Sequence, residues 1–290
     1  MPYDSLSSAE GAVENKGHLS LSGAQEKYSA VIDNGVFRLT RENEQGTYIL
    51  KPALTGFDNR EFSPANENLT MQIASQVYGF ETAENAVCVT RSGEQVYVTK
   101  RYDIAPDGRR IQQEDMASLA GITKNTHGEN FKYDALDYVN IANLIKRYIP
   151  AWRIELRKYF SLMLFNFVFA NGDAHVKNFS VIQTSAGDYR LAPAYDLINT
   201  LLHIPDGSIF ALRKGLYPGW TPEFGVYGSD FIKFGFMIGL DETFVKSEID
   251  RFCSDYKETE ALISNSFLNE ELKRQYTQIY QARIKYYLKH

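Results

Sequence analysis

The stretch Asn171–Asn199, NGDAHVKNFSVIQTSAGDYRLAPAYDLIN, decides the fold. It begins with a carboxylate and an amide five residues apart, Asp173 and Asn178. Two β-prone runs follow, and the Ser-Ala-Gly-Asp turn between them predicts a hairpin. Asp196 comes directly after the second run. The stretch therefore places a carboxylate and an amide before a hairpin, and a second carboxylate after it.

This spacing is that of the catalytic loop and metal site of protein kinases. In kinases an Asp orients the acceptor hydroxyl, an Asn five positions later binds Mg²⁺, and a second Asp beyond a hairpin also binds Mg²⁺. The usual H-R-D and D-F-G letters are replaced here by G-D-A-H-V-K-N and A-Y-D. The pattern predicts an ATP-dependent phosphotransferase, with the hairpin strands at Phe179–Gln183 and Tyr189–Ala192.

Composition limits the size of the fold and the class of partner. The chain has 290 residues, of which 44% are hydrophobic and 23% charged, which allows one large domain or two lobes. Its 31 basic and 36 acidic side chains give a net charge of −5, so the whole chain is not a nucleic-acid binder by electrostatics. Cys88 and Cys253 lie far apart and have no metal-binding spacing.

The sequence gives no sign of a secretory signal or a membrane span. The N-terminal MPYDSLSSAEGAVENKG has no basic region followed by an apolar stretch. Tyr159–Ala170 is apolar, but it is twelve residues long and contains Asn166, whereas a spanning helix needs about 20 residues. We expect a buried core helix at this position and a cytoplasmic protein without membrane contact.

Upstream of the central stretch, a small-residue loop precedes a hairpin. Leu19–Ser22 can be extended before a glycine turn, and Lys27–Ile32 and Val36–Leu39 are joined by an Asp-Asn-Gly turn. The hydroxyls and open backbone N–H groups of the loop can bind phosphate oxygens. In isolation, a plain strand-end turn explains the loop better. The phosphate-binding interpretation gains its support from the residues downstream. The candidate phosphate ligands are Ser20, Ser22 and Gly23.

A lysine and a glutamate are candidates for an ion pair at the phosphates. Lys51 ends the β-prone run Thr47–Ala53, one strand after the loop, where kinases keep the lysine that binds the α- and β-phosphates. Ser63 and Pro64 predict a helix start as N-cap and first-turn proline, and Glu67 in its first turns would be the partner. The alternatives are a solvated lysine and an acid that stabilises the helix dipole.

Strands give way to helices in the second half of the chain. Ala86–Thr90 and Gln95–Thr99 predict another hairpin, and the connection that follows would meet the adenine. Ile122–Tyr133 is expected to be a polar loop, and His203–Gly228 an irregular segment facing the acceptor. Periodicity predicts helices at Asp115–Ala120, Leu136–Tyr148, Ile154–Ala170, Phe231–Ile238, Glu242–Phe252 and Leu268–Leu288.

Together these elements predict an α+β fold with two lobes, like that of protein kinases. Residues 1–17 would form a flexible arm. Residues 18–103 would form a small β-rich N-lobe with the phosphate loop and the ATP lysine. Residues 104–290 would form a larger, mostly helical C-lobe with the catalytic loop and the metal site.

Five ordered motifs resemble the HipA family of bacterial serine/threonine kinases, known as toxins of toxin–antitoxin modules. They are SLSGAQEKY, TYILKP, the QED run at Gln113–Asp115, GDAHVKNFSV and YRLAPAYDL, which together span about residues 19–200. Five motifs in the family's order are more specific than any single motif. The resemblance implies ATP and Mg²⁺ as cofactors.

The resemblance also implies a role for each candidate residue. Asp173 would be the catalytic base, and His175 and Lys177 would contact the transferring phosphate. Ser20 and Ser22 match the loop serines at which family members autophosphorylate. The remaining implied roles are metal binding by Asn178 and Asp196, ATP-phosphate binding by Lys51, a hinge at Lys100, Arg101 and Tyr102, and an ATP contact at Gln113.

The short segment before the phosphate loop resembles the HipT branch, in which a separate small HipS-like protein supplies the N-terminal subdomain. The resemblance further implies a HipB-like DNA-binding antitoxin, DNA contact only through that antitoxin, and an aminoacyl-tRNA synthetase as the protein substrate. Two alternatives stay open, which are a kinase with a small-molecule acceptor and an inactive antitoxin-binding module. Intact Lys51, Asp173, Asn178 and Asp196 count against the inactive module.

Overall fold

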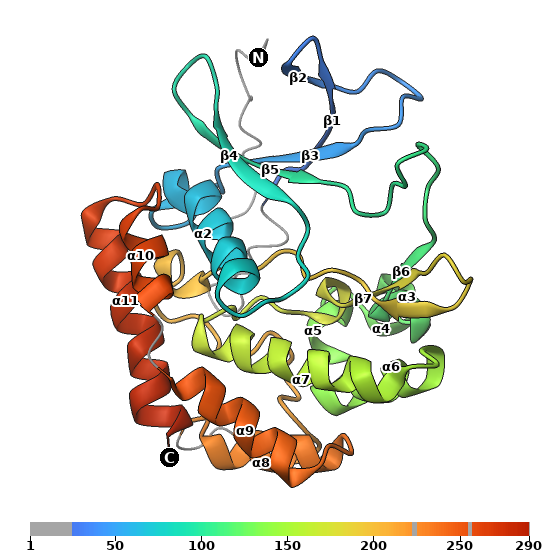
Figure 1. Ribbon diagram of the computed structural model, residues 1–290, viewed down its shortest axis with the longest axis vertical. Coiled ribbons are helices and arrows are strands. Elements are labelled where there is room, and N and C mark those ends of the chain that lie inside the picture. The colour runs from blue at the N-terminus through green and yellow to red at the C-terminus, as the bar shows by residue number, and fades with distance from the viewer. Residues whose placement is uncertain (1–24, 222–224, 255–256, 290) are drawn as a thin grey trace.

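The computed structural model describes residues 25–221, 225–254 and 257–289 (Figure 1). The predicted phosphate-loop residues Ser20, Ser22 and Gly23, and the predicted arm at 1–17, lie outside this range. The described chain begins with a β-rich part and continues into a mostly helical part, as the sequence predicted. The boundary predicted near residue 103 stays a prediction.

A five-stranded antiparallel sheet forms the first part, in the order β2-β1-β3-β5-β4. Its first hairpin turns at Asn34 and Gly35, which have φ angles of 51° and 76°, so the predicted Asp-Asn-Gly turn is confirmed. In the sheet Lys51 stands opposite Tyr97. The strands are β1 (Tyr28–Asp33), β2 (Val36–Leu39), β3 (Tyr48–Pro52), β4 (Asn85–Val89) and β5 (Gln95–Lys100).

The helix α2 (Ser63–Gln76) packs against β4 and β5 and carries Glu67 on its buried side (Figure 1). Pro64 lies in its first turn as predicted, but the predicted N-cap is wrong. The short 3₁₀ helix η1 (Arg60–Phe62) leads directly into α2, so Phe62 is the N-cap. The Ser63 hydroxyl instead accepts a hydrogen bond from the Leu54 N–H, 3.0 Å away.

The second part is built around α7 (Trp152–Val168), which lies between α6, α9 and α11 (Figure 1). Its buried side chains confirm the predicted core helix. In the described part of the chain no helix is long and apolar enough to cross a membrane. The other helices are α3 (Met116–Leu119), α4 (Lys124–His127), α5 (Phe131–Asp134), α6 (Tyr138–Tyr148), α8 (Gly228–Met237), α9 (Glu242–Cys253), α10 (Lys257–Ser264) and α11 (Glu270–Arg283).

A small antiparallel sheet, β6-β7-β8, lies in the second part and includes the hairpin of the stretch Asn171–Asn199. The predicted hairpin is confirmed as β7 (Ser180–Gln183) and β8 (Tyr189–Leu191). The third strand, β6 (Gln113–Asp115), pairs with β7 and was not predicted as a strand. This pairing brings the QED motif beside the catalytic hairpin.

Four helical features differ from the sequence-based expectation. The predicted polar loop Ile122–Tyr133 contains α4 and overlaps α5, both of four residues, and Thr123 caps α4 through a capping box. Helix α10 was missed. The last predicted helix, Leu268–Leu288, divides into α11 and the π-helical turn η4 (Ile284–Leu288). Four-residue helices are too short to give a periodic pattern, which explains why α4 and α5 escaped prediction.

Candidate active site

Lys51 forms the centre of a buried ion-pair chain. Its Nζ lies 2.5 Å from Glu67 Oε1 and also contacts Asp196 Oδ1. The Lys51 and Glu67 side chains are each 3% exposed. β3 supplies the lysine, α2 the glutamate, and the residue five positions beyond β8 the aspartate. The predicted Lys51–Glu67 contact is thus present in the structure.

Lys51 and Asp196 stay charged because they are close together. Burial lowers the pKa of Lys51, but Asp196 and Glu67 raise that pKa by more, and the net change is upward. Burial raises the pKa of Asp196, but Lys51 and Lys27 lower it further, and the net change is downward. Burial raises the pKa of Glu67 despite the attraction of Lys51. A lysine cation therefore lies between the Asp196 carboxylate and the Glu67 carboxyl group, at the junction of sheet, helix and hairpin.

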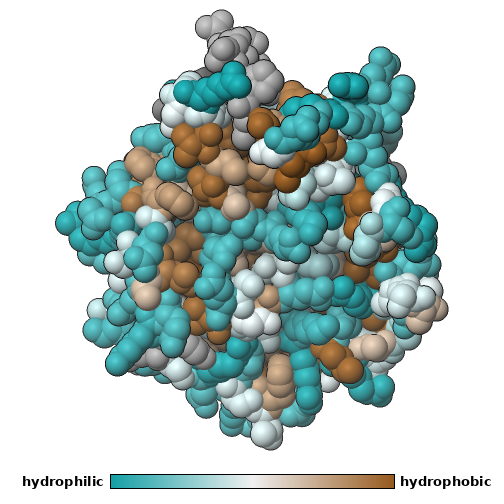
Figure 2. All heavy atoms as spheres, turned by 45° about the horizontal axis from the view of Figure 1, so that its top comes forward, coloured by the Kyte–Doolittle hydropathy of each residue, from teal (hydrophilic) through white to brown (hydrophobic). Residues whose placement is uncertain are grey.

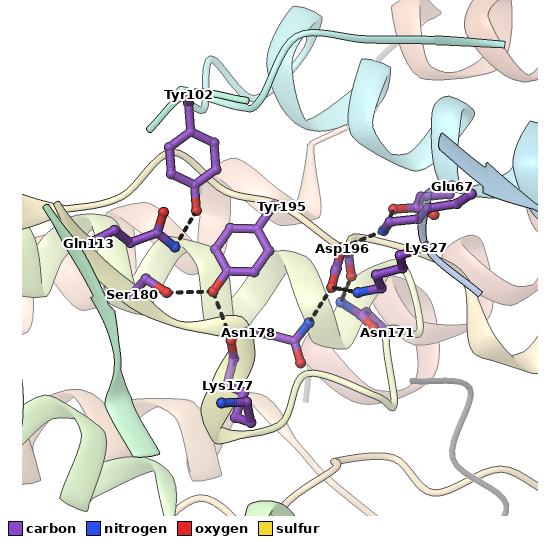
Figure 3. Close-up of polar contacts among 11 residues, drawn as sticks. Lys27, Glu67, Tyr102, Gln113, Asn171, Lys177, Asn178, Ser180, Tyr195 and Asp196 are labelled. Atoms are coloured by element: carbon purple, nitrogen blue, oxygen red, sulfur yellow. Dashed lines mark hydrogen bonds and ion pairs between the residues drawn. The ribbon is translucent and has the colours of Figure 1, made fainter. Parts of the chain in front are cut away.

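Asp196 sits on a strained backbone that directs its side chain toward Asn178. Its φ is 55°, in the left-handed region that non-glycine residues rarely adopt. Asn178 Nδ2 donates to Asp196 Oδ2 at 3.2 Å, and Asn171 Nδ2 donates to the Asp196 carbonyl at 3.4 Å (Figure 3). Strained residues cluster at functional sites, so this backbone conformation indicates that Asp196 belongs to one.

The Asn178–Asp196 pair fits a magnesium ion. Asn178 Oδ1 is buried and accepts no hydrogen bond from the described residues. A buried, unpartnered amide oxygen beside a carboxylate offers two hard oxygen donors. Mg²⁺ typically uses one or two carboxylates together with substrate phosphates rather than an all-protein cage. The described residues hold no cluster of three or more His, Cys, Asp or Glu side chains suited to a metal.

Asp173 lies at the same small cavity as the lysine and the candidate metal ligands. Its carboxylate accepts a hydrogen bond from the Tyr133 hydroxyl at 3.1 Å, and its N–H donates to Asn171 Oδ1 at 3.4 Å. Asp173 and Asp196 are 23 positions apart in the sequence, and the structure brings them to one site. Residues lining this cavity are Gln25, Lys27, Lys51, Leu54, Glu67, Asp173, Asn178, Asp196 and Ile198.

Lys27 belongs to this site, and the sequence reasoning missed it. Its Nζ donates to Asp196 Oδ2 at 3.2 Å, and its side chain is 41% exposed (Figure 3). Lys27 lies directly before β1, in the SLSGAQEKY motif. It is the lysine of that motif, which was the signal available in the sequence. A second cation therefore reaches the candidate metal ligand from the solvent side.

A larger cavity of about 540 Å³ lies next to the cavity that Asp173 borders. Gln113 Nε2 donates to the Tyr102 hydroxyl at 2.9 Å, and the Tyr195 hydroxyl contacts Ser180 Oγ at 2.6 Å (Figure 3). Its volume falls in the range of small-molecule sites. Its walls are Arg101, Asp103, Arg110, Ile111, Gln112, Gln113, Glu114, Asp115, Lys177, Ser180 and Tyr195.

The predicted hinge residues differ in where their side chains point. Lys100 pairs with Glu84 on the surface at 3.1 Å and does not line either cavity. Arg101 lines the larger cavity and donates twice to Asp103, at 2.9 and 2.5 Å. The Tyr102 ring centroid lies 5.9 Å from that of Tyr195. Arg101 therefore lines the larger cavity and Tyr102 contacts two of its lining residues, Gln113 and Tyr195, whereas the Lys100 ammonium lies elsewhere.

The structure does not bring His175 and Lys177 to the catalytic cavity. The His175 side chain is buried, and burial lowers its pKa to about 3, so the ring is neutral at neutral pH. It packs edge-on against Tyr133, with ring centroids 5.3 Å apart. Lys177 Nζ lies 2.5 Å from Asp115 Oδ2 and faces the larger cavity. The contacts with a transferring phosphate expected for both residues stay predictions.

A buried polar network fixes α2 against the segment that follows Asp196. Asn66 Nδ2 donates to the Asn199 carbonyl at 2.8 Å, and Asn66 Oδ1 accepts from the Asn199 N–H at 3.2 Å. The same amide contacts His203 Nε2 at 2.9 Å. Asn66 and Asn199 are fully buried. Because Asn66 directly precedes Glu67, the network fixes the glutamate relative to Asp196.

A β-rich sheet with a buried lysine–glutamate pair, joined to a helical part with an Asp, Asn and Asp site, defines a protein-kinase-like fold. The model of the HipA-like C-terminal domain family matches residues 19–259 of this chain. The chain therefore belongs to the HipA-like C-terminal domain family.

Two bacterial relatives carry the name "Putative kinase". One, from Haemophilus influenzae, is 29% identical over 274 residues, covering 86% of this chain and 76% of the relative. The other, Y4mE of Sinorhizobium fredii, is 30% identical over 206 residues, covering 68% of this chain and 46% of the relative. This chain is thus related to kinases of the HipA family, and it spans less than half of the second relative.

Two solved structures have the same fold. HipA of the Shewanella oneidensis MR-1 toxin–antitoxin system, in complex with HipB and operator DNA, aligns with a TM-score of 0.71 at 20% identity. That alignment covers 95% of this chain and 66% of the HipA chain. The proinflammatory kinase CtkA of Helicobacter pylori aligns with a TM-score of 0.54 at 12% identity, covering 90% of both chains. The predicted two-lobed α+β fold is confirmed.

Proposed function

We propose that the chain is an ATP-dependent serine/threonine protein kinase, the toxin of a toxin–antitoxin system of the HipA type. One observation carries this proposal. The Lys51–Glu67–Asp196 ion-pair chain ends beside the unpartnered Asn178 Oδ1, at the cavity that Asp173 borders. Lysine, amide and carboxylates at one cavity are the parts that phosphoryl transfer from ATP needs.

The two cavities divide the recognition of ATP between them. Lys51, held between Glu67 and Asp196, would bind phosphate oxygens, and Lys27 would approach them from the solvent side. The adenosine would occupy the larger cavity, with Tyr195, Gln113 and the Arg101–Tyr102 connection beside it. Its volume of about 540 Å³ is sufficient for a nucleoside.

Asn178 and Asp196 would hold Mg²⁺, and Asp173 would act as the base. When bound, the metal supplies charge neutralisation at the phosphate oxygens. Asp173 accepts a hydrogen bond from a hydroxyl in this structure, which is what it would do with an acceptor Ser or Thr. Neutral, buried His175 packs against Tyr133. It would hold the loop that carries Asp173 without adding charge.

Autophosphorylation of Ser20 and Ser22 would switch the kinase off. Both serines lie outside the described residues, but the chain resumes at Gln25 and Lys27, which line the catalytic cavity. A phosphoserine carries roughly −1.5 to −2 charges, which would repel ATP phosphates at this place. The ATP affinities of the phosphorylated and unphosphorylated chains test this, and equal affinities would argue against it.

The proposed partners are a HipB-like antitoxin and a small HipS-like protein, as in the HipT branch. The Shewanella HipA occurs with HipB and operator DNA, and this chain covers 66% of that HipA. Ile32, Val36 and Val89 are exposed apolar residues of the N-terminal sheet, at 48%, 45% and 62% exposure. On the face that Figure 2 shows, hydrophobic residues gather toward the end that carries this sheet. These exposed apolar side chains support docking of a small protein. The net charge of −5 is the ground for DNA contact only through the antitoxin.

The proposed acceptor is a component of translation, an aminoacyl-tRNA synthetase in particular, on the ground of family resemblance. Incubation of the chain with labelled ATP and a bacterial lysate, followed by identification of the labelled species, tests the acceptor class. A labelled synthetase supports the proposal, whereas a labelled small molecule would favour the alternative of a small-molecule kinase. An Asp196→Asn variant is the matched control, because it removes a metal-ligating carboxylate at similar volume.

A further inference from the structure

The Tyr133 hydroxyl is hydrogen-bonded to the carboxylate of the proposed base, Asp173. Tyr133 lies in the short helix α5, and its Oη donates to Asp173 Oδ1 at 3.1 Å. A general base must lie within about 2.6–3.2 Å of the oxygen whose proton it takes. The Tyr133 hydroxyl therefore has the hydrogen-bond geometry that an acceptor hydroxyl needs at Asp173.

The position of Tyr133 is fixed by the segment that follows the metal-site hairpin. The Arg213 N–H donates to the Tyr133 carbonyl at 3.0 Å, and Arg213 Nη1 lies 2.8 Å from Asp134 Oδ2. Lys214 Nζ donates to the Ala135 carbonyl at 2.8 Å. The His175 ring packs edge-on against the Tyr133 ring. These contacts on both sides hold the hydroxyl at the base.

Asp173 also borders the cavity that contains Lys51, Asn178 and Asp196. The oxygen that would be phosphorylated thus lies beside the base that would take its proton. Both lie close to the residues proposed to bind phosphate and metal. We infer that Tyr133 is an internal phosphate acceptor, phosphorylated by the same chain that carries it. The inference rests on the proposed kinase function and adds a tyrosine to its substrates.

The step balances as a simple phosphoryl transfer. The Tyr133 Oη forms a bond to the γ-phosphorus of ATP, and the bond from that phosphorus to the bridging oxygen of ADP breaks. The tyrosine proton passes to Asp173 and from there to solvent. The products are ADP and phosphotyrosine, and no oxidant or further reactant is needed.

The product would slow further transfer. A phosphotyrosine adds roughly −1.5 to −2 charges, directly beside the Asp173 carboxylate. Like charges at this distance disfavour a second anionic phosphate in the cavity. Lys132, whose Nζ lies 5.0 Å from the Tyr133 ring centroid, is the nearby cation that would offset part of the new charge. The modification would therefore slow further transfer by the chain that carries it.

Site mapping tests the inference directly. The full chain is incubated with MgATP, ADP is quantified, and phosphorylated residues are located by mass spectrometry at two protein concentrations that differ tenfold. We expect phosphate on Tyr133 with a rate constant that is unchanged by dilution, because donor site and acceptor share one chain. Tyr148→Phe is the matched control, since its hydroxyl donates to the Leu119 carbonyl away from the site, and it should label Tyr133 like the wild type.

A mixing experiment completes the test. Tagged Asp173→Asn chain, which keeps Tyr133 but lacks the base, is incubated with untagged wild type and MgATP. It should stay unlabelled at Tyr133, and labelling of that tagged chain would overturn transfer within one chain. ADP formation or serine phosphorylation with Tyr133 unlabelled would overturn the inference and leave the proposed function standing. Bound MgATP with no ADP and no phosphorylation anywhere would overturn both.

Discussion

Asn66 pairs with both backbone groups of Asn199, although 133 residues separate them. Its side chain acts like a neighbouring strand, donating to the carbonyl and accepting from the N–H. The pair joins the helix that carries Glu67 to the segment that follows Asp196. Since the two carboxylates must hold Lys51 between them, this pairing is a positioning element of the site.

Replacing Asn66 with Leu should lower both stability and activity. The substitution leaves the buried N–H and C=O of Asn199 without this partner, and each unsatisfied group costs about 1–3 kcal/mol. We expect a loss of about 2–6 kcal/mol in the free energy of unfolding, measured by urea titration. ADP formation should fall as well, because Glu67 loses its fixed position.

Asn68 on the same helix provides the control. Its Nδ2 donates to Asn85 Oδ1 at 2.9 Å in a half-buried place on the other side of α2 from this network. Asn68→Leu should cost less than about 1.5 kcal/mol, the net value of one hydrogen bond. Equal losses for the two variants would show that Asn66 is an ordinary helix residue.

Lys27 should matter for ATP and little for folding. Its contact with Asp196 is partly exposed, and exposed ion pairs contribute about 0–1 kcal/mol to stability. Lys27→Met should leave the unfolding midpoint nearly unchanged and raise the KM for ATP roughly tenfold, equivalent to about 1.4 kcal/mol of binding. Lys100→Met, which removes a surface pair with Glu84, should change neither quantity. An unaltered KM in the Lys27 variant would remove this residue from the site.

Buried neutral histidines should make the protein less stable in acid. Burial lowers the pKa of His175 to about 3, whereas an unfolded histidine titrates near about 6.5. Between these values the unfolded chain binds a proton that the folded chain does not, so stability falls as pH decreases. His203, whose pKa burial also lowers, adds to the same effect.

The pH effect has a measurable slope. Each such histidine contributes up to about 1.4 kcal/mol per pH unit. Urea unfolding of the wild type and His175→Gln at pH 7, 6 and 5 should show a stability difference that shrinks as the pH is lowered. A difference that is constant across this range would contradict a neutral, buried His175.

Asn178 should control the metal requirement. Asn178→Leu removes the buried amide oxygen that accepts no hydrogen bond from the described residues. The Mg²⁺ concentration for half-maximal ADP formation should rise roughly tenfold, or about 1.4 kcal/mol, with folding retained. Asn265→Leu, on the exposed turn after α10, is the control. An unchanged Mg²⁺ requirement would exclude Asn178 as a metal ligand.

Local signals predicted much of the site. Asp173, Asn178 and Asp196 fall within one stretch, and a hairpin signal between them fixes how the ends meet. Lys51 lies near the end of a β-prone run, and Glu67 lies in the first turns of a helix with a clear start signal. Only their pairing had to be assumed. The N-terminal sheet followed from alternating β-prone runs and an Asp-Asn-Gly turn.

The unpredicted contacts are long-range ones. Lys27 and Asp196 are 169 residues apart, and no local pattern indicates that they meet. The Asn66–Asn199 pair depends on how two distant segments pack, and Tyr133 reaches Asp173 from a helix too short to give periodicity. Those contacts depend on tertiary packing, which a single sequence does not display.

The central claim is phosphoryl transfer from ATP with Asp173 as the base. The most direct test compares wild type and Asp173→Asn for ATP affinity by calorimetry and for transferred phosphate under single-turnover conditions. We predict that the variant folds, binds MgATP with similar affinity and transfers phosphate at least about a hundredfold more slowly, the lower range for a lost general base. Equal transfer by the two proteins would contradict the account.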